Sequence, residues 1–305
     1  MTIGVALAGL ELKTPLIGAS GLFGYGGRYG TLVDYAPFGA IVAKTITLSP
    51  RTGNAPPRVA DADSGLLNSI GLENVGVEAF LREELPRVSL PCKLIASVGG
   101  ETVEEYAEVA TALKGAVGID AIEINISCPN VTRGCLAFGK DAVTAREVVQ
   151  AVRGETALPL LVKLPPLVVG IEDVARAATD GGADALVVAN NLPGMVIDLA
   201  TERPALGGLW GGYSGRAVRP VSLLLVWKVA GCVDAPIVAT GGIERAEDAV
   251  EFILAGASAF EIGSVMLKDL GAPAKIMGGL LGFMKARGYE TIEEFRGKAR
   301  QASRR

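Results

Sequence analysis

Short apolar runs alternate with amphipathic stretches from one end of the chain to the other. Eight of these runs show little alternation between polar and apolar residues, which is typical of parallel strands that are covered on both faces. We therefore predict strands over residues 16–18, 40–43, 93–96, 121–124, 160–163, 185–188, 237–239 and 259–262.

The stretches between these strands carry apolar residues at helical spacing. We predict helices over residues 102–110, 171–178 and 246–254, and a further barrel helix around 221–227. A glycine recurs where a helix gives way to the next strand, at Gly118, Gly182 and Gly256. About eight strand–helix units in succession predict an α/β fold of the closed (β/α)₈ TIM-barrel type.

An open, doubly wound sheet is the alternative architecture, and it usually carries a Gly-x-Gly-x-x-Gly turn after its first strand. The glycines within residues 24–30 have a different spacing, so we interpret that stretch as a flexible loop. Residues 5–7 and 10–12 predict a short N-terminal hairpin at the bottom of the barrel. The long insert of residues 48–74 after strand 2 contains several prolines and glycines and predicts a lid or a site wall. We expect residues 1–305 to form a single domain.

Composition removes several classes of protein. Half of the 305 residues are hydrophobic and the net charge is −4, so no basic surface for nucleic acid is expected. We expect no signal peptide, and the apolar run at 221–227 is interrupted by Lys228 and is too short to span a membrane. The four cysteines form no Cys-x-x-Cys pair, which argues against disulfides and against an iron–sulfur cluster within this chain. We expect a cytoplasmic protein.

The chain has no histidine, which excludes Ser-His-Asp and Cys-His catalysis and histidine metal sites. Acid–base chemistry must use other side chains. The segment 125–130, Asn-Ile-Ser-Cys-Pro-Asn, follows a predicted strand and places a thiol between carboxamides. An isolated cysteine beside a proline is usually a small buried residue, but its position at a strand end makes Cys128 the best candidate base.

Other polar residues gather at the carboxyl ends of the predicted strands, where (β/α)₈ barrels carry their active sites. Lysines are expected at two of these ends, Lys44 and Lys163, and amides at three positions, Asn125, Asn190 and Asn191. The segments after strands 7 and 8, 241–242 and 263–264, contain the glycines that a phosphate site in such barrels requires, although glycines there also serve tight turns. Residues 68–74 of the insert could close a polar pocket for a planar heterocycle.

Several motifs together resemble dihydroorotate dehydrogenase: residues 125–131, 68–74, 162–165, 211–215 and the two C-terminal glycine segments. The resemblance extends from residue 10 to at least Ser264. Residues 47–54 and 134–139 are most similar to class 1B, in which an FMN-containing barrel pairs with an iron–sulfur flavoprotein subunit. The resemblance implies oxidation of dihydroorotate to orotate in pyrimidine biosynthesis, with FMN as cofactor. It also implies a homodimer of the barrel that forms a heterotetramer with a partner subunit. The partner would carry FAD and [2Fe–2S] and pass electrons to NAD⁺.

The resemblance also implies roles for individual residues. Cys128 would be the general base, and Lys163 would stabilise negative charge on the reduced flavin. The residues implied in FMN binding are Ser20, Lys44, Thr45, Ser97, Asn125, Lys163, Ala189, Gly215, Gly241, Gly242, Gly263 and Ser264. The residues implied in substrate binding are Lys44, Asn68, Ser69, Ile70, Gly71, Leu72, Asn125, Asn130, Asn190 and Asn191. The chain departs from the usual pattern at Ser97, Asn191 and Ser264, where relatives often have Asn, Thr and Thr.

Four other functions remain open. Two are close relatives: an FMN enzyme that acts on another dihydropyrimidine, and a class 1A dihydroorotate dehydrogenase that uses fumarate. The third is a phosphate-binding barrel lyase or isomerase in which Lys163 forms a Schiff base. The fourth, a scaffold without catalytic activity, is disfavoured by the crowded polar rim.

Overall fold

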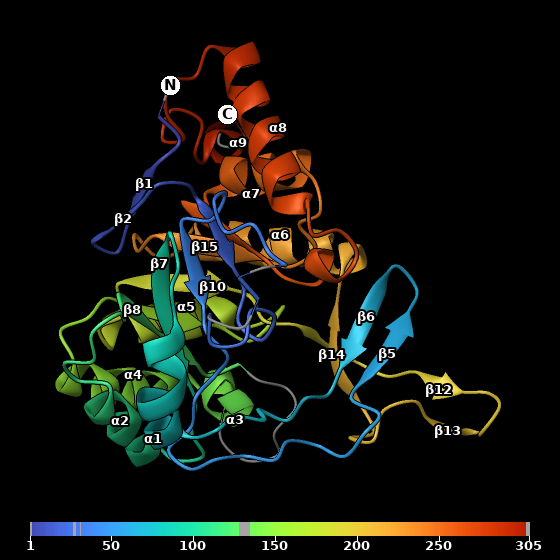
Figure 1. The fold of residues 1–305 in the computed structure, drawn as a ribbon. Coiled ribbons are helices and arrows are strands. Elements are labelled where there is room, and N and C mark those ends of the chain that lie inside the picture. The colour runs from blue at the N-terminus through green and yellow to red at the C-terminus, as the bar shows by residue number, and fades with distance from the viewer. Residues whose placement is uncertain (1, 27–28, 31, 128–134, 303–305) are drawn as a thin grey trace.

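The computed structural model describes residues 2–26, 29–30, 32–127 and 135–302. Eight parallel strands close into a barrel, with register pairs such as Ile262 with Gly18 joining the last strand to the first. In order around the barrel the strands are β3 (Leu16–Gly18), β4 (Ala40–Val42), β7 (Lys93–Val98), β8 (Ala121–Asn125), β9 (Leu160–Lys163), β10 (Ala185–Val188), β15 (Ile237–Thr240) and β16 (Ala259–Ile262). All eight predicted strands are present, and the predicted (β/α)₈ barrel is confirmed (Figure 1).

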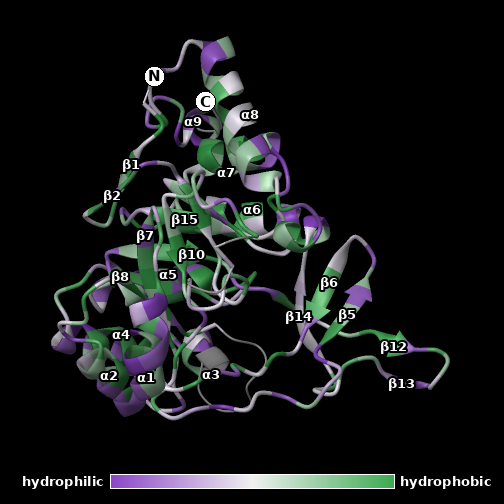
Figure 2. Cartoon of the chain, in the orientation of Figure 1, coloured by the Kyte–Doolittle hydropathy of each residue, from purple (hydrophilic) through white to green (hydrophobic). Residues whose placement is uncertain are grey.

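The barrel strands are buried on both faces, as their uniform hydrophobicity predicts. Every residue of β3, β4, β8, β9, β10, β15 and β16 is buried, and Figure 2 shows the barrel strands as the hydrophobic centre of the molecule. Two of these buried residues are carboxylates, Glu123 and Glu261, which have no place in an ordinary apolar core.

Helices on the outside of the barrel supply the outer layer. They are α1 (Val77–Ala79), α2 (Val103–Ala112), α3 (Cys135–Lys140), α4 (Ala142–Glu155), α5 (Ile171–Asp180), α6 (Arg219–Val229), α7 (Ala246–Ala255), α8 (Ala272–Arg287) and α9 (Lys298–Ala302). The predicted helices correspond to α2, α5, α6 and α7. In α5 the buried positions are Ile171, Val174, Ala175 and Ala178, the spacing of one helix face. In α2 the Thr102 side chain accepts a hydrogen bond from the Glu105 N–H and caps the helix.

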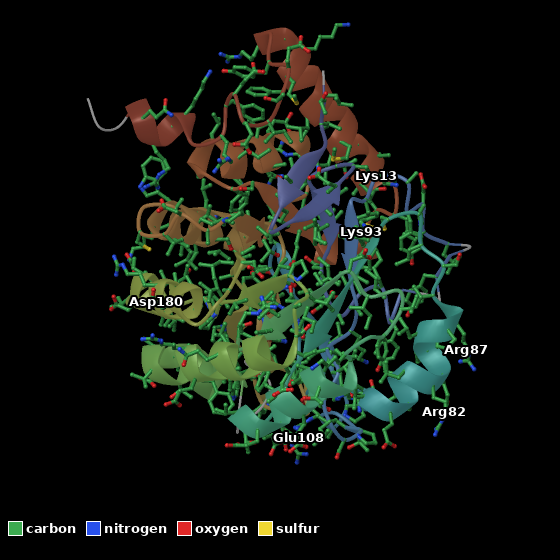
Figure 3. All side chains as sticks on the ribbon, turned by 90° about the vertical axis from the view of Figure 1, so that its left-hand side faces the viewer. Lys13, Arg82, Arg87, Lys93, Glu108 and Asp180 are labelled. Carbon is green, nitrogen blue, oxygen red and sulfur yellow. The ribbon has the colours of Figure 1, made fainter. Side chains whose placement is uncertain are left out.

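The predicted N-terminal hairpin is formed by β1 (Val5–Leu7) and β2 (Leu10–Leu12), which pair antiparallel. The linker after it contacts segments that lead into barrel strands. Thr14 Oγ1 donates to the Pro37 carbonyl at 2.7 Å, and Lys13 Nζ donates to the Pro91 carbonyl at 3.1 Å. Figure 3 shows Lys13 close to Lys93, the first residue of β7. The hairpin therefore lies toward the N-terminal ends of the barrel strands, opposite the end where these folds carry their sites.

The insert after β4 forms half of a second, antiparallel sheet that sequence analysis did not predict. Its strands β5 (Val59–Ala62) and β6 (Gly65–Asn68) pair with β14 (Gly211–Ser214) and β11 (Leu192–Gly194) in the order β11-β14-β6-β5. Gly212 lies opposite Asn68 in this sheet. Segments that follow barrel strands β4 and β10 are thereby held together.

A small hairpin of β12 (Ile197–Asp198) and β13 (Arg203–Pro204) projects beyond this sheet (Figure 1). Charged side chains such as Arg82, Arg87, Glu108 and Asp180 lie on the outside of the molecule (Figure 3). Within the described ranges, no helix combines the length and the apolar character needed to cross a bilayer.

Candidate active site

A cavity of about 410 Å³ opens at the carboxyl ends of the barrel strands. Its walls come from the strand ends and from the second sheet, and most of the residues implied in binding line it. Those residues are Ser20, Lys44, Thr45, Asn68, Ile70, Gly71, Leu72, Asn125, Lys163, Ala189, Asn190, Asn191, Gly215, Gly241, Gly242, Gly263 and Ser264.

The floor of the cavity carries a buried ammonium group held by two carboxylates. Lys163 Nζ lies 2.7 Å from Glu261 Oε2 and 3.5 Å from Glu123 Oε2. Burial alone would lower the pKa of Lys163, but the two carboxylates outweigh burial and raise it above the ordinary value. Lys163 therefore remains a cation at neutral pH. A fixed positive charge in a buried cavity suits a ligand that carries or acquires negative charge.

A hydrogen-bond network fixes the orientation of the Asn125 carboxamide. Its Nδ2 donates to Thr45 Oγ1 at 3.2 Å, and its Oδ1 accepts from the backbone N–H of Ser127 at 3.2 Å and from Ser127 Oγ at 2.9 Å. Asn190 Nδ2 donates to the same Ser127 hydroxyl at 2.9 Å. Nδ2 of Asn125 carries two protons, and Thr45 accepts one of them. Among the described residues the other proton has no acceptor, so it can serve a ligand.

The insert contributes a charged wall. Lys44 Nζ lies 3.5 Å from Glu73 Oε2, and Arg58 Nη1 lies 3.0 Å from the same oxygen. The Lys44 ammonium is the main cause of the lowered pKa of Glu73. Lys44 lines the cavity and Arg58 shares Glu73 with it, so the Glu73 carboxylate does not fully offset the Lys44 ammonium, which is suited to a carboxylate on a ligand.

The opposite end of the cavity is built from glycine backbone. Gly241 and Gly242 adopt positive φ values of 112° and 75°, and a side chain on Gly242 would come within 2.9 Å of the backbone nitrogen of Arg219 at the start of α6. The glycines therefore pack their loop against the first turn of that helix. Backbone N–H groups here, with Gly263 and Ser264 nearby, form a surface on which a phosphate can be bound.

Two of the implied binding residues do not line the cavity. Ser97 is fully buried, and its hydroxyl lies 2.9 Å from Thr45 Oγ1 in a hydrogen bond that supports the wall. Ser69 Oγ accepts from Asn54 Nδ2 at 2.9 Å and is also buried. Both positions support other residues. Cys128 and Asn130 lie outside the described residues.

Glu123, Glu261 and Ser127 belong to the site but were not among the residues predicted from the sequence. The two carboxylates stand within apolar runs, Ala-Ile-Glu-Ile and Ala-Phe-Glu-Ile, and a single acid inside a buried strand was the signal that could have identified them. Ser127 was visible only as part of the 125–130 motif. Its role depends on the approach of Asn190 from the next barrel strands, which no local pattern encodes.

Comparisons with known proteins agree with this geometry. The family described as Dihydroorotate dehydrogenase matches residues 2–284. This chain belongs to the dihydroorotate dehydrogenase family.

Three curated relatives that match over 90% or more of their own lengths share the name "Dihydroorotate dehydrogenase B (NAD(+)), catalytic subunit". The protein of Desulforudis audaxviator (strain MP104C) is 47% identical over 296 residues, which cover 97% of this chain and 96% of that protein. The protein of Desulforamulus reducens is 45% identical over 300 residues, or 98% of this chain and 99% of that protein. The protein of Geobacter sp. (strain M21) is 44% identical over 273 residues, or 89% and 90%. The predicted family and its type B character are confirmed.

Proposed function

We propose that this chain oxidises dihydroorotate to orotate with FMN bound in the barrel cavity, as the catalytic subunit of an NAD⁺-linked dihydroorotate dehydrogenase. The observation that carries the proposal is the single cavity lined both by the residues implied in flavin binding and by those implied in pyrimidine binding. The names of relatives that cover nearly the whole chain support the same reaction.

The donors in the cavity match the groups of FMN. Backbone glycines at Gly241, Gly242 and Gly263 suit the phosphate, because their N–H groups can approach oxygens without obstruction by a side chain. At the other end the ammonium of Lys163 suits the polar edge of the isoalloxazine ring, where negative charge accumulates on reduction. Thr45, Asn125 and Ala189 would line the ring between these ends.

When bound, FMN supplies an acceptor for the hydride from C6 of the substrate. Cys128 takes the proton from C5, since a thiol titrates close enough to neutral pH to act as a base and histidine is absent. The carboxamides of Asn68, Asn125 and Asn190 orient the pyrimidine edges, and the network through Ser127 holds two of them in place. Lys44 binds the substrate carboxylate.

The geometry argues against a Schiff-base lyase or isomerase. A Schiff-base lysine must lose its proton before it attacks a carbonyl carbon. Lys163 is held as an ammonium by Glu123 and Glu261, which raise its pKa. Its environment therefore favours a permanent charge over a nucleophile.

The name "catalytic subunit" carried by the relatives supports a partner protein. We propose that the partner carries FAD and a [2Fe–2S] centre and passes electrons to NAD⁺, and that two barrels and two partners form a heterotetramer around a barrel homodimer. We also propose a cytoplasmic location, because a complex that reduces NAD⁺ in nucleotide synthesis requires the cytoplasmic pool. Cys92 and Cys232, which are free thiols, are consistent with a reducing compartment.

Anaerobic mixing tests the reaction. The purified chain should have a flavin spectrum that bleaches within seconds of addition of dihydroorotate, with formation of orotate. Dihydrouracil serves as the matched substrate that lacks the carboxylate, and it should bleach the flavin far more slowly. Equal bleaching by both substrates would favour a different dihydropyrimidine oxidoreductase, and a colourless protein that binds no FMN would refute the proposal.

A further inference from the structure

Three charged groups from three strands meet at the floor of the cavity. Lys163 of β9 contacts Glu261 of β16 at 2.7 Å and Glu123 of β8 at 3.5 Å. The Lys163 side chain is 6% exposed and both glutamate side chains are 0% exposed. The proposed reaction requires the lysine but assigns no task to two carboxylates.

The charge of this cluster does not balance if every group is ionised. One ammonium and two carboxylates leave a net charge of −1 in a site where both carboxylate side chains are fully buried. Both oxygens of Glu123 and Oε1 of Glu261 are buried, and within the part of the chain that the structure describes no well-aligned hydrogen bond reaches them. Ser97 and Glu261 still lie close enough to influence the pKa of Glu123, the serine by lowering it and the glutamate by raising it. An unpaired buried carboxylate is far more costly than a protonated one, so one proton is the simplest way to neutralise the cluster.

The other strands around the cluster offer no further charge. Ser97 of β7 stands opposite Glu123, and Thr240 of β15 and Ile17 of β3 stand opposite Glu261. Lys44, the other lysine of the cavity, is directed to Glu73. Burial raises the pKa of Glu123 to about 8; the Lys163 ammonium opposes this effect and the Glu261 carboxylate adds to it.

We propose that Glu123 and Glu261 hold one proton between them beneath Lys163 near neutral pH, so that the floor of the cavity is neutral and becomes negative only in alkaline solution. A carboxyl proton between the two groups also gives the unpartnered oxygens a donor. The proton is a property of this chain alone. The effect of this proton on the flavin rests on the proposed function.

The shared proton would set how the cavity responds to negative charge. With a neutral floor, the Lys163 ammonium faces the ring with its charge balanced by a single carboxylate. Loss of the proton adds a unit negative charge at the same place, which disfavours the reduced, more negative ring. Glu123 and Glu261 therefore set the net charge beneath Lys163 and would affect the flavin through that charge.

Infrared spectroscopy of the full-length protein as purified tests the proton directly. With ¹³C-carboxyl glutamate as label, wild type should show one protonated, label-sensitive glutamic acid band at pH 6–7 that is lost toward pH 9–10. Glu123→Gln and Glu261→Gln should each lose the band, because the remaining carboxylate pairs with Lys163. Glu123→Asp should keep it, and the surface variant Glu108→Gln is the matched control. Absence of the band from wild type, or its persistence in both glutamine variants, would overturn the proposal.

The pH dependence of flavin affinity tests the consequence. From pH 7 to pH 9 the ratio of affinities for reduced and oxidised FMN should fall in wild type by roughly tenfold relative to Glu123→Gln, the order of magnitude expected for one buried unit charge near the ring at an effective dielectric constant of about 20. Redox-dye equilibration measures this ratio without any pyrimidine. An identical pH dependence in both proteins would refute the link to the flavin.

The two measurements also separate this inference from the proposed function. Neither measurement uses dihydroorotate, so both could still be interpreted if dihydroorotate failed to bleach the flavin. If the protein bound no FMN, the infrared band would still decide whether the proton is present. A variant that failed to fold would leave the pH titration of wild type as the deciding measurement.

Discussion

The buried carboxyl of Glu123 should make the stability of this protein fall with rising pH, and Glu123→Gln should remove most of that dependence. Glutamine has nearly the same shape as a protonated glutamic acid but cannot ionise. The pKa of Glu123 rises from an ordinary value of 4.5 to about 8, mainly because of burial. Between these two pH values the folded chain holds a proton that the unfolded chain has lost.

The sign and the size of the effect follow from this difference. A raised pKa means that the stabilisation is complete below pH 4.5 and is lost as the pH rises toward 8. Each pH unit in that interval costs about 1.4 kcal/mol, so the free energy of unfolding of wild type should drop by about 2.7 kcal/mol between pH 5.5 and 7.5 through this group alone. Lys163 does not change the pH dependence of the free energy of unfolding in this range, because a lysine with a raised pKa loses its proton only above about pH 10.

Urea unfolding at several pH values, with FMN fixed at a saturating concentration, measures the difference. The oxidised flavin ring is uncharged, so its contribution should differ little between the proteins. The free energy of unfolding of Glu123→Gln minus that of wild type should increase by about 2.7 kcal/mol from pH 5.5 to 7.5. For Glu108→Gln, an exposed substitution on α2, the free energy of unfolding should depend on pH in the same way as that of wild type. If the free energy of unfolding of Glu123→Gln had the same pH dependence as that of wild type, the Glu123 carboxyl would be ionised throughout this range and the prediction would be wrong.

Three further predictions concern the base, the phosphate loop and the partner. Cys128→Ser should keep its flavin but slow flavin reduction by dihydroorotate roughly 10²–10⁴-fold near neutral pH, and stopped-flow traces should show the defect shrink as the pH rises. Gly242→Ala should weaken FMN binding at least tenfold in fluorescence titrations, because its side chain would meet Arg219 at 2.8–2.9 Å at a φ of 75°; Gly278→Ala, with nothing within 4 Å, should bind normally. The isolated chain should reduce dyes with dihydroorotate but hardly reduce NAD⁺, and rapid NAD⁺ reduction without a partner would refute the two-subunit assembly.

The sequence by itself determined the architecture, because the signals for it are local. Most barrel strands are short apolar runs, such as Leu160–Lys163, that are followed by a helix, and the barrel in the structure uses every predicted run. Among the described residues, β3 leads to β4 without a helix between them. The chemical character of the rim was also local information. Lys44, Asn125 and Lys163 stand at strand ends in the sequence, and parallel strands bring their ends to one side of a barrel.

Only the tertiary structure decided which of these residues share a wall and which support it. Ser69 and Ser97 are predicted binding residues, but their hydroxyls pair with Asn54 and Thr45 and neither residue lines the cavity. The four-stranded sheet joins β6 to β14 across more than 140 residues, as in the contact of Asn68 Nδ2 with the Gly212 carbonyl at a separation of 144. Such pairings depend on long-range closure, for which no local pattern exists.

The cluster of Glu123, Lys163 and Glu261 illustrates the same division most clearly. Each residue is visible in the sequence as a charge within a strand, and Lys163 and Glu261 are 98 positions apart. Alternation along a strand gives each side chain one of two faces, but it does not say which face is the interior or which strands face each other across the barrel. Closure of β16 onto β3 settles both questions and creates the charged floor. The residues were given by the sequence, and their electrostatic coupling exists only because the barrel closes.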